Sequence, residues 1–251
     1  MAFMIYIEKM EDFNMRRRAS MSFSDFIKIY KWHVVIWIIG LIVLGNFVYK
    51  KVTAPTYLLN GMLLGAEGGE DASTALATEF AESIGYGDTV YAVNLDTEYS
   101  YISGSEEHAE SNYKATEKIV SQVEAKTLDF VAGPMNSLSD IAHNSMFMEL
   151  TTYLSPEQLT LVEPYLLYVD NAVIEELDEA YENKEDTSKI KLPDPRKPEE
   201  MKEPVAVMID MSSCVEIAEI YGNSDEAIAF GLITSAPNED ILVKFIDYLM
   251  K

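Results

Sequence analysis

The sequence predicts an α/β protein: a single N-terminal transmembrane helix followed by one three-layer α/β domain with a mostly parallel (mixed) sheet. Three observations lead to this class. An uninterrupted apolar run occupies residues 32–49, segments with strand and helix periodicity alternate beyond it, and residues 55–251 are numerous enough to bury a core of their own.

The apolar run at 32–49 contains no Asp, Glu, Lys or Arg. As an α-helix it would extend roughly 27 Å, close to the thickness of a bilayer's hydrocarbon core. Trp32 and Tyr49 stand at its two ends, and Lys31 and Lys50 lie just outside them. These four residues are expected at the membrane interface, where aromatic rings and long basic side chains reach the headgroups. A buried core helix is the alternative, but only 31 residues precede the run to cover it.

Basic residues set the expected orientation, because they are retained on the cytoplasmic side. Residues 12–31 hold five Lys and Arg, against two in residues 50–69. We therefore expect a single-pass protein of the cell membrane with a cytoplasmic N-terminus and an extracellular C-terminal domain. A cleaved signal peptide is the competing interpretation, but its one candidate site, residues 52–54, is followed by Pro55, which disfavours cleavage.

The segments around the helix have simpler expected roles. Residues 1–31 form the cytoplasmic tail, in which the apolar spacing over 22–31 predicts an amphipathic lead-in helix on the membrane surface. Residues 50–56 form a short tether to the outer domain at 57–251. Because Met15 and Met21 are alternative starts, the sequence leaves open whether residues 1–20 belong to the native protein.

Strand-like and helix-like segments alternate through the first half of the outer domain. The glycine-rich stretch 65–70 has neither a dinucleotide-binding nor a phosphate-loop spacing, so it predicts a turn. The predicted elements are strands over 57–64, 89–94 and 128–132 and helices over 72–84 and 106–126. In the second of these helices the inward stripe is predicted to consist of Ala109, Tyr113, Thr116, Ile119, Val120 and Val123.

Similar signals continue to the end of the chain. Ser155, Pro156 and Gln158 make a capping sequence that starts a helix, and Asn238 is expected to cap the last helix. Residues 183–204 hold four prolines among many charges and predict an exposed excursion without a core of its own. The other predicted elements are a helix through Leu138, Ile141, Ala142 and Leu150, a short apolar run over 165–169, a helix over 174–181, and strands over 205–211 and 228–233.

Charge and cysteine content exclude several function classes. Residues 55–251 carry 38 acidic and 11 basic side chains, a formal net charge of −27. Such a domain repels phosphate backbones, so we expect no nucleic-acid partner. The single cysteine, Cys214, excludes an internal disulfide framework, and its apolar, strand-like surroundings predict a buried thiol. An exported domain without disulfides is typical of many bacteria.

Residues 115–170 and 204–251 resemble the extracellular solute-binding proteins of bacterial ABC importers, which have the type II periplasmic-binding fold. The resemblance lies in the stretches 114–132, 145–154, 204–210 and 228–248. It implies a ligand-side loop after the third strand and a last strand and helix that return to the first lobe. The whole chain also resembles a group of membrane-anchored proteins of Gram-positive Firmicutes.

The chain departs from the solute-binding family in two ways. Only 34 residues, 171–204, stand where the family inserts a second lobe, and no lipobox cysteine precedes the domain. The resemblance therefore implies a domain reduced to about one lobe, anchored by its helix and without the two-lobed clamp that gives transport receptors their affinity.

No pattern of catalytic or metal-binding residues is present in the sequence. His108 and His143 fall in separate predicted helices without metal-ligand spacing, and neither a nucleophile elbow nor an EF-hand loop occurs. Cys214 with His143 is a conceivable thiol dyad, although nothing in the sequence brings the two together. We expect no enzyme activity, no cofactor and no metal site.

A ligand of a parallel sheet binds at the carboxyl ends of its strands. Sugar stacking would depend on tyrosines such as Tyr91 or Tyr168, since both tryptophans lie in the apolar run. Arg196, the one arginine of the outer domain, lies in the excursion, which argues against a carboxylate or phosphate held by two parallel bonds. The candidate ligand-binding residues are Glu67, Gly68, Asn94, Asp96, Gly133, Asn136, Asp210, Ser212 and Ser213.

Three functions follow from these patterns. The first is a membrane-anchored extracellular solute-binding-like or interaction domain, whose partners besides the lipid bilayer are a small solute or peptide, or another membrane or cell-wall protein. The second is a degenerate binding fold that serves as a structural subunit or scaffold of a membrane complex. The third is an extracellular hydrolase of unfamiliar design.

Overall fold

The computed structural model describes residues 35–45, 57–66, 68–87, 92–222 and 226–251. The chain divides into two units, Met1–Ala54 and Pro55–Lys251, and each is described by itself.

Residues 35–45 form a helix in the first unit. Its large apolar side chains, from Val35 to Leu44, are 43% to 74% exposed. Among the described residues, no helix is both long enough and apolar enough to cross a membrane. The segment expected to span, 32–49, continues beyond the described helix at both ends. Its interface residues, the lead-in helix and the tether also lie outside the described residues; these are Lys31, Trp32, Tyr49, Lys50, 22–31 and 50–56.

Six strands of the second unit form one sheet in the order β2-β1-β3-β6-β5-β4. They are β1 (Tyr57–Leu63), β2 (Ala92–Asp96), β3 (Phe130–Pro134), β4 (Leu166–Asp170), β5 (Pro204–Asp210) and β6 (Ile228–Leu232). β1 runs parallel to both of its neighbours, whereas the β3–β6, β6–β5 and β5–β4 pairs are antiparallel. The α/β class and the mixed sheet are confirmed, but the prediction of a mostly parallel sheet is wrong. The alternation of strands and helices along the chain does not determine strand direction here, because the last strand, β6, inserts between β3 and β5 and runs antiparallel to both.

Helices separate these strands along the chain. Residues 138–150, expected as one helix, form the end of one helix and the start of another, and the helix after Cys214 was not predicted. The α-helices are α3 (Glu70–Ser83), α4 (Ala109–Glu124), α5 (Met135–Ala142), α6 (Leu150–Tyr153), α7 (Pro156–Val162), α8 (Asn171–Asn183), α9 (Val215–Ile220) and α10 (Glu239–Leu249). Short 3-10 turns cover Glu163–Tyr165, Thr187–Lys189 and Pro198–Glu200.

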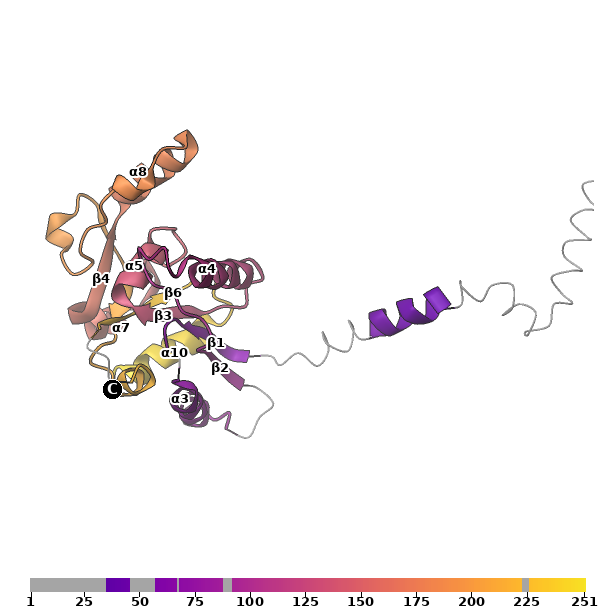
Figure 1. The fold of residues 1–251 in the computed structure, drawn as a ribbon. Coiled ribbons are helices and arrows are strands. Elements are labelled where there is room, and N and C mark those ends of the chain that lie inside the picture. The colour runs from indigo at the N-terminus through magenta and orange to yellow at the C-terminus, as the bar shows by residue number, and fades with distance from the viewer. Residues whose placement is uncertain (1–34, 46–56, 67, 88–91, 223–225) are drawn as a thin grey trace, which may run out of the picture. The chain divides into compact units, whose positions relative to one another are not determined.

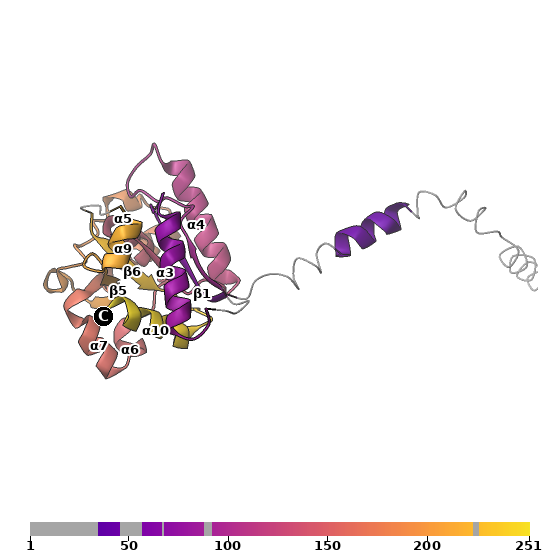
Figure 2. The same cartoon turned by 90° about the horizontal axis from the view of Figure 1, so that it is seen from below.

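Apolar side chains pack on both faces of the sheet, and Figures 1 and 2 show helices on both sides of it from two directions. On one face, the rings of Phe130 and Phe230 stack with centroids 4.4 Å apart, and Phe80 of α3 meets Phe245 of α10 edge to face at 4.8 Å. On the other face, Ile119 of α4 and Leu138 of α5 are buried in a second apolar cluster with strand residues. Burial of this apolar surface is the main stabilising contribution to the domain.

α4 presents only part of the predicted stripe to the core, since Ile119 is buried and Val123 packs against the same apolar cluster. Ala115 and Ile119 are its buried residues, whereas Tyr113 is 68% exposed and Ala109 and Thr116 are exposed. The apolar spacing therefore located the helix correctly, but it identified the inward stripe only in part. The aromatic ring of Tyr113 added to the apparent stripe, although the tertiary packing leaves it exposed.

Two helix starts were predicted from capping residues, with different outcomes. At α7 the reciprocal capping box is present, since Gln158 N donates to Ser155 Oγ at 3.3 Å and Ser155 N donates to Gln158 Oε1 at 2.9 Å. At α10 the side chain of Asn238 makes no capping hydrogen bond. Its backbone N–H instead donates to the carboxylate of Asp129 at 3.0 Å. A tertiary contact thus replaces the local cap.

The proline-rich excursion at 183–204 returns to the sheet. Pro195 and Met201 are buried in an otherwise mostly exposed segment. The carbonyl of Pro195 accepts from Tyr168 N at 2.9 Å, on the outer side of β4. At the end of β4 the carboxylate of Asp170 accepts from Lys202 N at 2.9 Å and Glu203 N at 3.0 Å. The excursion thereby covers part of the open edge of β4, and proline suits this place because it offers no N–H to another strand.

Candidate functional site

The carboxyl ends of four strands meet at one edge of the sheet. β1, β2 and β3 are parallel, and β5 runs with β3 because both pair antiparallel with β6. Residues that follow these four strands therefore lie at the same end of the sheet. Open α/β sheets bind their ligands at this end. Asn136 follows β3 in the first turn of α5, and Asp210 and Ser212 lie at the end of β5.

A hollow of about 430 Å³ lies at this edge. Its volume falls within the range of roughly 300–1,000 Å³ that small-molecule sites occupy. Two of the predicted site residues, Asn136 and Ser212, line it together with Arg196. The complete lining is Met135, Asn136, Arg196, Met211, Ser212, Ala218, Tyr221, Glu226, Ala227 and Ile228.

Asp210 does not itself line this hollow, but it is bonded to two side chains that do, Arg196 and Ser212. Its carboxylate accepts from the backbone N–H of Ser212 at 3.0 Å and also from the Ser212 hydroxyl. The same hydroxyl oxygen accepts from Ile228 N at 3.1 Å, so it connects β5 to the start of β6. On its other oxygen Asp210 accepts from Arg196 Nη2 at 2.7 Å.

These contacts hold Asp210 in its charged form. Burial of the carboxyl by itself raises its pKa, but the hydrogen bonds from Ser212 and Arg196 more than offset this effect and leave the pKa of Asp210 below its ordinary value. A charged carboxylate at this place fixes one side of the Arg196 guanidinium.

Arg196 lines this hollow, although it was not among the candidate residues selected from the sequence. The excursion brings its side chain to the sheet edge, where it is 48% exposed and lines the hollow. One of its N–H groups donates to Asp210. A guanidinium has five N–H donors, so the group can also donate to acceptors of a bound molecule. Its fourteen-residue separation from Asp210 gave no local signal for this pair.

A second hollow, of about 760 Å³, adjoins the first, since Met135 and Asn136 line both. Charged side chains of both signs surround it. It is lined by Ser103, Met135, Asn136, Ser139, Asp140, Lys191, Leu192, Pro193, Asp194, Pro195, Lys197 and Glu200. The excursion and α5 therefore form the walls of one continuous depression that begins beside Arg196.

Tyr221 also lines the first hollow. Its hydroxyl oxygen is buried and has no hydrogen-bond partner within the described part of the chain. Burial raises the pKa of Tyr221, so the hydroxyl stays protonated and can donate.

The remaining candidate residues do not join this site. Gly68 lies in the turn after β1 with φ +87°, and Glu67 lies outside the described residues. Asp96 caps its own turn by accepting from Glu98 N at 3.0 Å. Gly133 lies within β3, where an added Cβ would press against Leu64. Ser213 is exposed and lines neither hollow.

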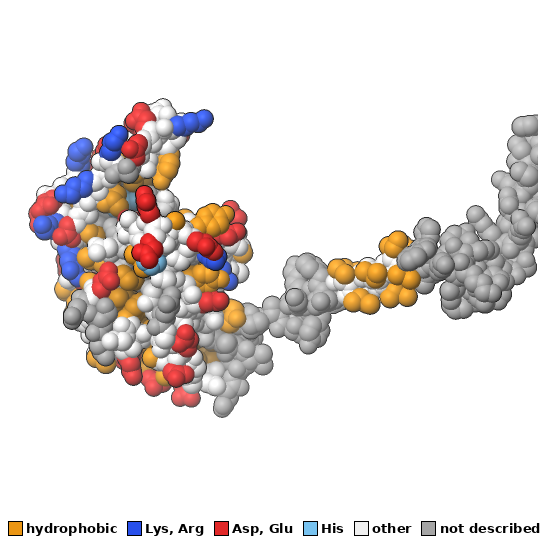
Figure 3. Space-filling view, viewed as in Figure 1, with side chains coloured by type: hydrophobic (Ala, Val, Ile, Leu, Met, Phe, Trp, Pro, Cys, Tyr) orange, Lys and Arg blue, Asp and Glu red, His pale blue; other side chains and the backbone are white. Residues whose placement is uncertain are grey.

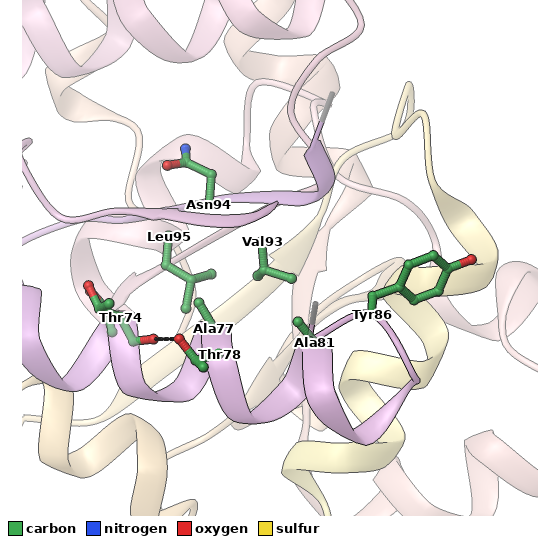
Figure 4. Close-up of a pocket in the computed structure, with 10 residues that line it drawn as sticks. Thr74, Ala77, Thr78, Ala81, Tyr86, Val93, Asn94 and Leu95 are labelled. Atoms are coloured by element: carbon green, nitrogen blue, oxygen red, sulfur yellow. Dashed lines mark hydrogen bonds between the residues drawn. The ribbon is translucent and has the colours of Figure 1, made fainter. Parts of the chain in front are cut away.

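Asn94 belongs to a different place. Its side chain donates to Asn60 Oδ1 at 2.7 Å, and it lines a hollow of about 250 Å³ between β2 and α3, drawn in Figure 4. Of the tyrosines considered for stacking, Tyr168 is half-buried in β4 and Tyr91 lies outside the described residues.

Among the described residues at the carboxyl ends of the strands, the contacts are hydrogen bonds and ion pairs. Cys214 is buried as predicted, but at the start of α9 and not in a strand, and it packs in the cluster on the α3 face. His143 follows α5, which packs on the opposite face, so the two do not form a dyad. Burial of the thiol raises the pKa of Cys214 to about 11. Within the described ranges no cluster of His, Cys, Asp or Glu is arranged to hold a metal ion.

No family model, curated protein or solved structure matches this chain.

Proposed function

We propose that the chain is a non-enzymatic, single-pass membrane protein whose outer domain binds a small polar solute or a peptide end in the hollow beside Arg196. The observation that carries this proposal is the convergence of Arg196, Ser212 and Asn136, from three separate parts of the chain, on one hollow at the carboxyl ends of the strands. Asp210 is bonded to both Arg196 and Ser212.

The charges at the hollow favour a ligand that offers both acceptors and donors. Arg196 presents N–H groups, while the side chains of Asn136 and Ser212 carry acceptor oxygens. The domain carries a formal net charge of −27, so it repels a purely anionic molecule at long range. A neutral or zwitterionic molecule fits both conditions.

The resemblance to one lobe of a type II solute-binding protein supports the same function. α8 and the excursion stand where that family inserts its second lobe. A hollow walled by one lobe leaves a bound molecule open to water on one side, so binding is weak compared with that of a receptor that closes. The apolar run 32–49 supports anchoring of the domain at the cell surface.

Thermal unfolding of the full-length chain with a panel of amino acids, dipeptides and sugars tests the proposal. At least one compound is expected to raise the midpoint of the wild type and to lose this effect in Arg196→Ala. Lys189→Ala is the matched control, because Lys189 is an exposed cation of the same excursion that lines neither hollow at the edge. A panel without any effect would contradict solute binding.

The second candidate function is a structural or docking subunit of a membrane complex. An open strand edge, described below, favours it. The hydrolase has no comparable support, because no activated nucleophile is found among the described residues at the carboxyl ends of the strands.

A further inference from the structure

The two edge strands of the sheet, β4 and β2, differ in how their outer sides are covered. At β4 the excursion contributes Pro195, whose carbonyl bonds to the outer side of the strand. At the other edge β2 pairs with β1 alone among the described residues. No described strand takes up the N–H and C=O groups on the outer side of β2, whereas proteins usually cover or block such an edge.

A groove runs beside this open edge. Val93 and Leu95 of β2 point toward α3, whereas Asn94 points to the opposite face (Figure 4). The α3 residues across from them, Thr74, Ala77, Thr78 and Ala81, are all small, and with β2 they enclose a space of about 250 Å³. The Thr78 hydroxyl donates to the Thr74 carbonyl at 2.8 Å, so this polar group is already satisfied within the helix.

The geometry suits an additional strand. Side chains of a strand alternate between the two faces of a sheet. A segment paired with β2 would place every second side chain on the α3 side, over the groove, and the small side chains of α3 leave room for these. Main-chain hydrogen bonds would supply affinity and the groove would supply selectivity, as in other complexes formed by strand addition.

Charge indicates the kind of segment that fits. Every charged residue between Val52 and Tyr113 is Asp or Glu. These include Glu79 and Glu82 of α3 and Asp96 at the end of β2. Figure 3 shows acidic side chains on the part of this face that lies over α3, while Lys and Arg side chains visible there lie over α8 and the excursion and beside α4. Around β2 the potential therefore favours a cation.

We propose that the open edge of β2 binds an extended, basic segment of a partner protein, which adds to the sheet as a seventh strand next to β2 and places alternate side chains over α3. A second copy of this chain is a poor occupant, because its own β2 edge is equally acidic and each domain carries a formal charge of −27. This docking surface is separate from the hollow beside Arg196 and does not depend on solute binding.

Fluorescence anisotropy with defined peptides tests the pairing. The probe is a labelled peptide of alternating lysine and valine, added to the full-length chain. Two further versions carry N-methyl groups on one or the other set of alternate backbone amides. Only one set of amides faces β2 in an added strand, so one methylated version is expected to bind at least about tenfold more weakly while the other binds nearly as well as the parent. Equal binding of all three peptides would overturn strand addition, since simple charge attraction ignores the backbone.

Two variants test the position. Thr78→Trp fills the groove and is expected to abolish binding of the lysine–valine peptide. Ala75→Trp, at an exposed position of the same helix that does not line the groove, is expected to leave binding unchanged. Far-UV circular dichroism verifies that both variants are folded, and Arg196→Ala should bind the peptide like the wild type. Equal binding by the two tryptophan variants would contradict this position. A wild type that forms dimers which Thr78→Trp dissociates would show that a second copy, and not a basic peptide, occupies the edge.

Discussion

Asp129 offers a direct test of how a buried carboxylate holds the sheet together. Its side chain is 0% exposed, and each of its two oxygens accepts from a different backbone N–H: Asn60 of β1 at 2.8 Å and Asn238 before α10 at 3.0 Å. Asp129→Asn keeps the size but offers one acceptor, because the amide NH₂ must face the second donor. Where the carboxyl is ionised, at the high end of the pH range, the loss of one buried hydrogen bond costs about 1–3 kcal/mol of the free energy of unfolding.

The pH dependence of this cost follows from the pKa. Burial raises the pKa of Asp129, although the N–H groups of Asn60 and Asn238 partly oppose the shift. A carboxyl whose pKa is higher in the folded state contributes stability that is fully present below the unfolded pKa and is lost as the pH rises through the folded pKa. Asp129→Asn lacks this pH-dependent contribution to the free energy of unfolding, because an amide does not titrate. Its penalty is therefore expected to be largest below the ordinary aspartate range and to shrink as the pH rises.

Urea titrations at several pH values measure the penalty. Both tryptophans lie before residue 55, so far-UV circular dichroism is the suitable signal for the domain. Asp178→Asn, on the exposed side of α8, is the control and should change the unfolding free energy little at any pH. A penalty of Asp129→Asn that grows with rising pH would refute the raised pKa and the role given to burial.

Three other outcomes are expected. Phe230→Ala removes a ring that is 0% exposed and stacked on Phe130, so it should lower the free energy of unfolding by about 3–5 kcal/mol in the same urea titration. The Cys214 thiol, whose pKa burial raises to about 11, should react with a thiol reagent at neutral pH only after denaturant is added; rapid labelling of the native chain would contradict its burial. A protease added to intact cells should degrade residues 55–251 if the apolar run 32–49 anchors the chain as proposed, and an untouched domain would contradict that topology.

Local signals predicted much of the secondary structure. The reciprocal bonds of Ser155 and Gln158 start α7 because both partners lie within one helical turn. β1 and β3 were located within about two residues, since a short apolar run between turn-forming residues depends on its own sequence. Cys214 was correctly predicted to be buried from the apolar residues around it, although the helix that follows was missed.

The candidate site was predictable only in part. Asn136, Asp210 and Ser212 follow strands, so the rule that ligands bind at carboxyl ends selected them. The same rule selected Asp96, Gly133 and Ser213, which the structure places elsewhere, because position after a strand says nothing about where a side chain points. Arg196 was discounted for its proline-rich surroundings, and no spacing in the sequence indicated that Asp210 would pair with it.

By itself, the sequence determined the alternation of helices and strands, the acidic character of the domain and the absence of disulfides, because each depends on composition or on residues a few positions apart. The tertiary structure decided the direction of β6, the buried face of α4 and the contact of Arg196 with Asp210. These features depend on which distant segments pack together. The total burial and hydrogen bonding of the whole sheet decide that packing, and no single stretch of sequence contains this information.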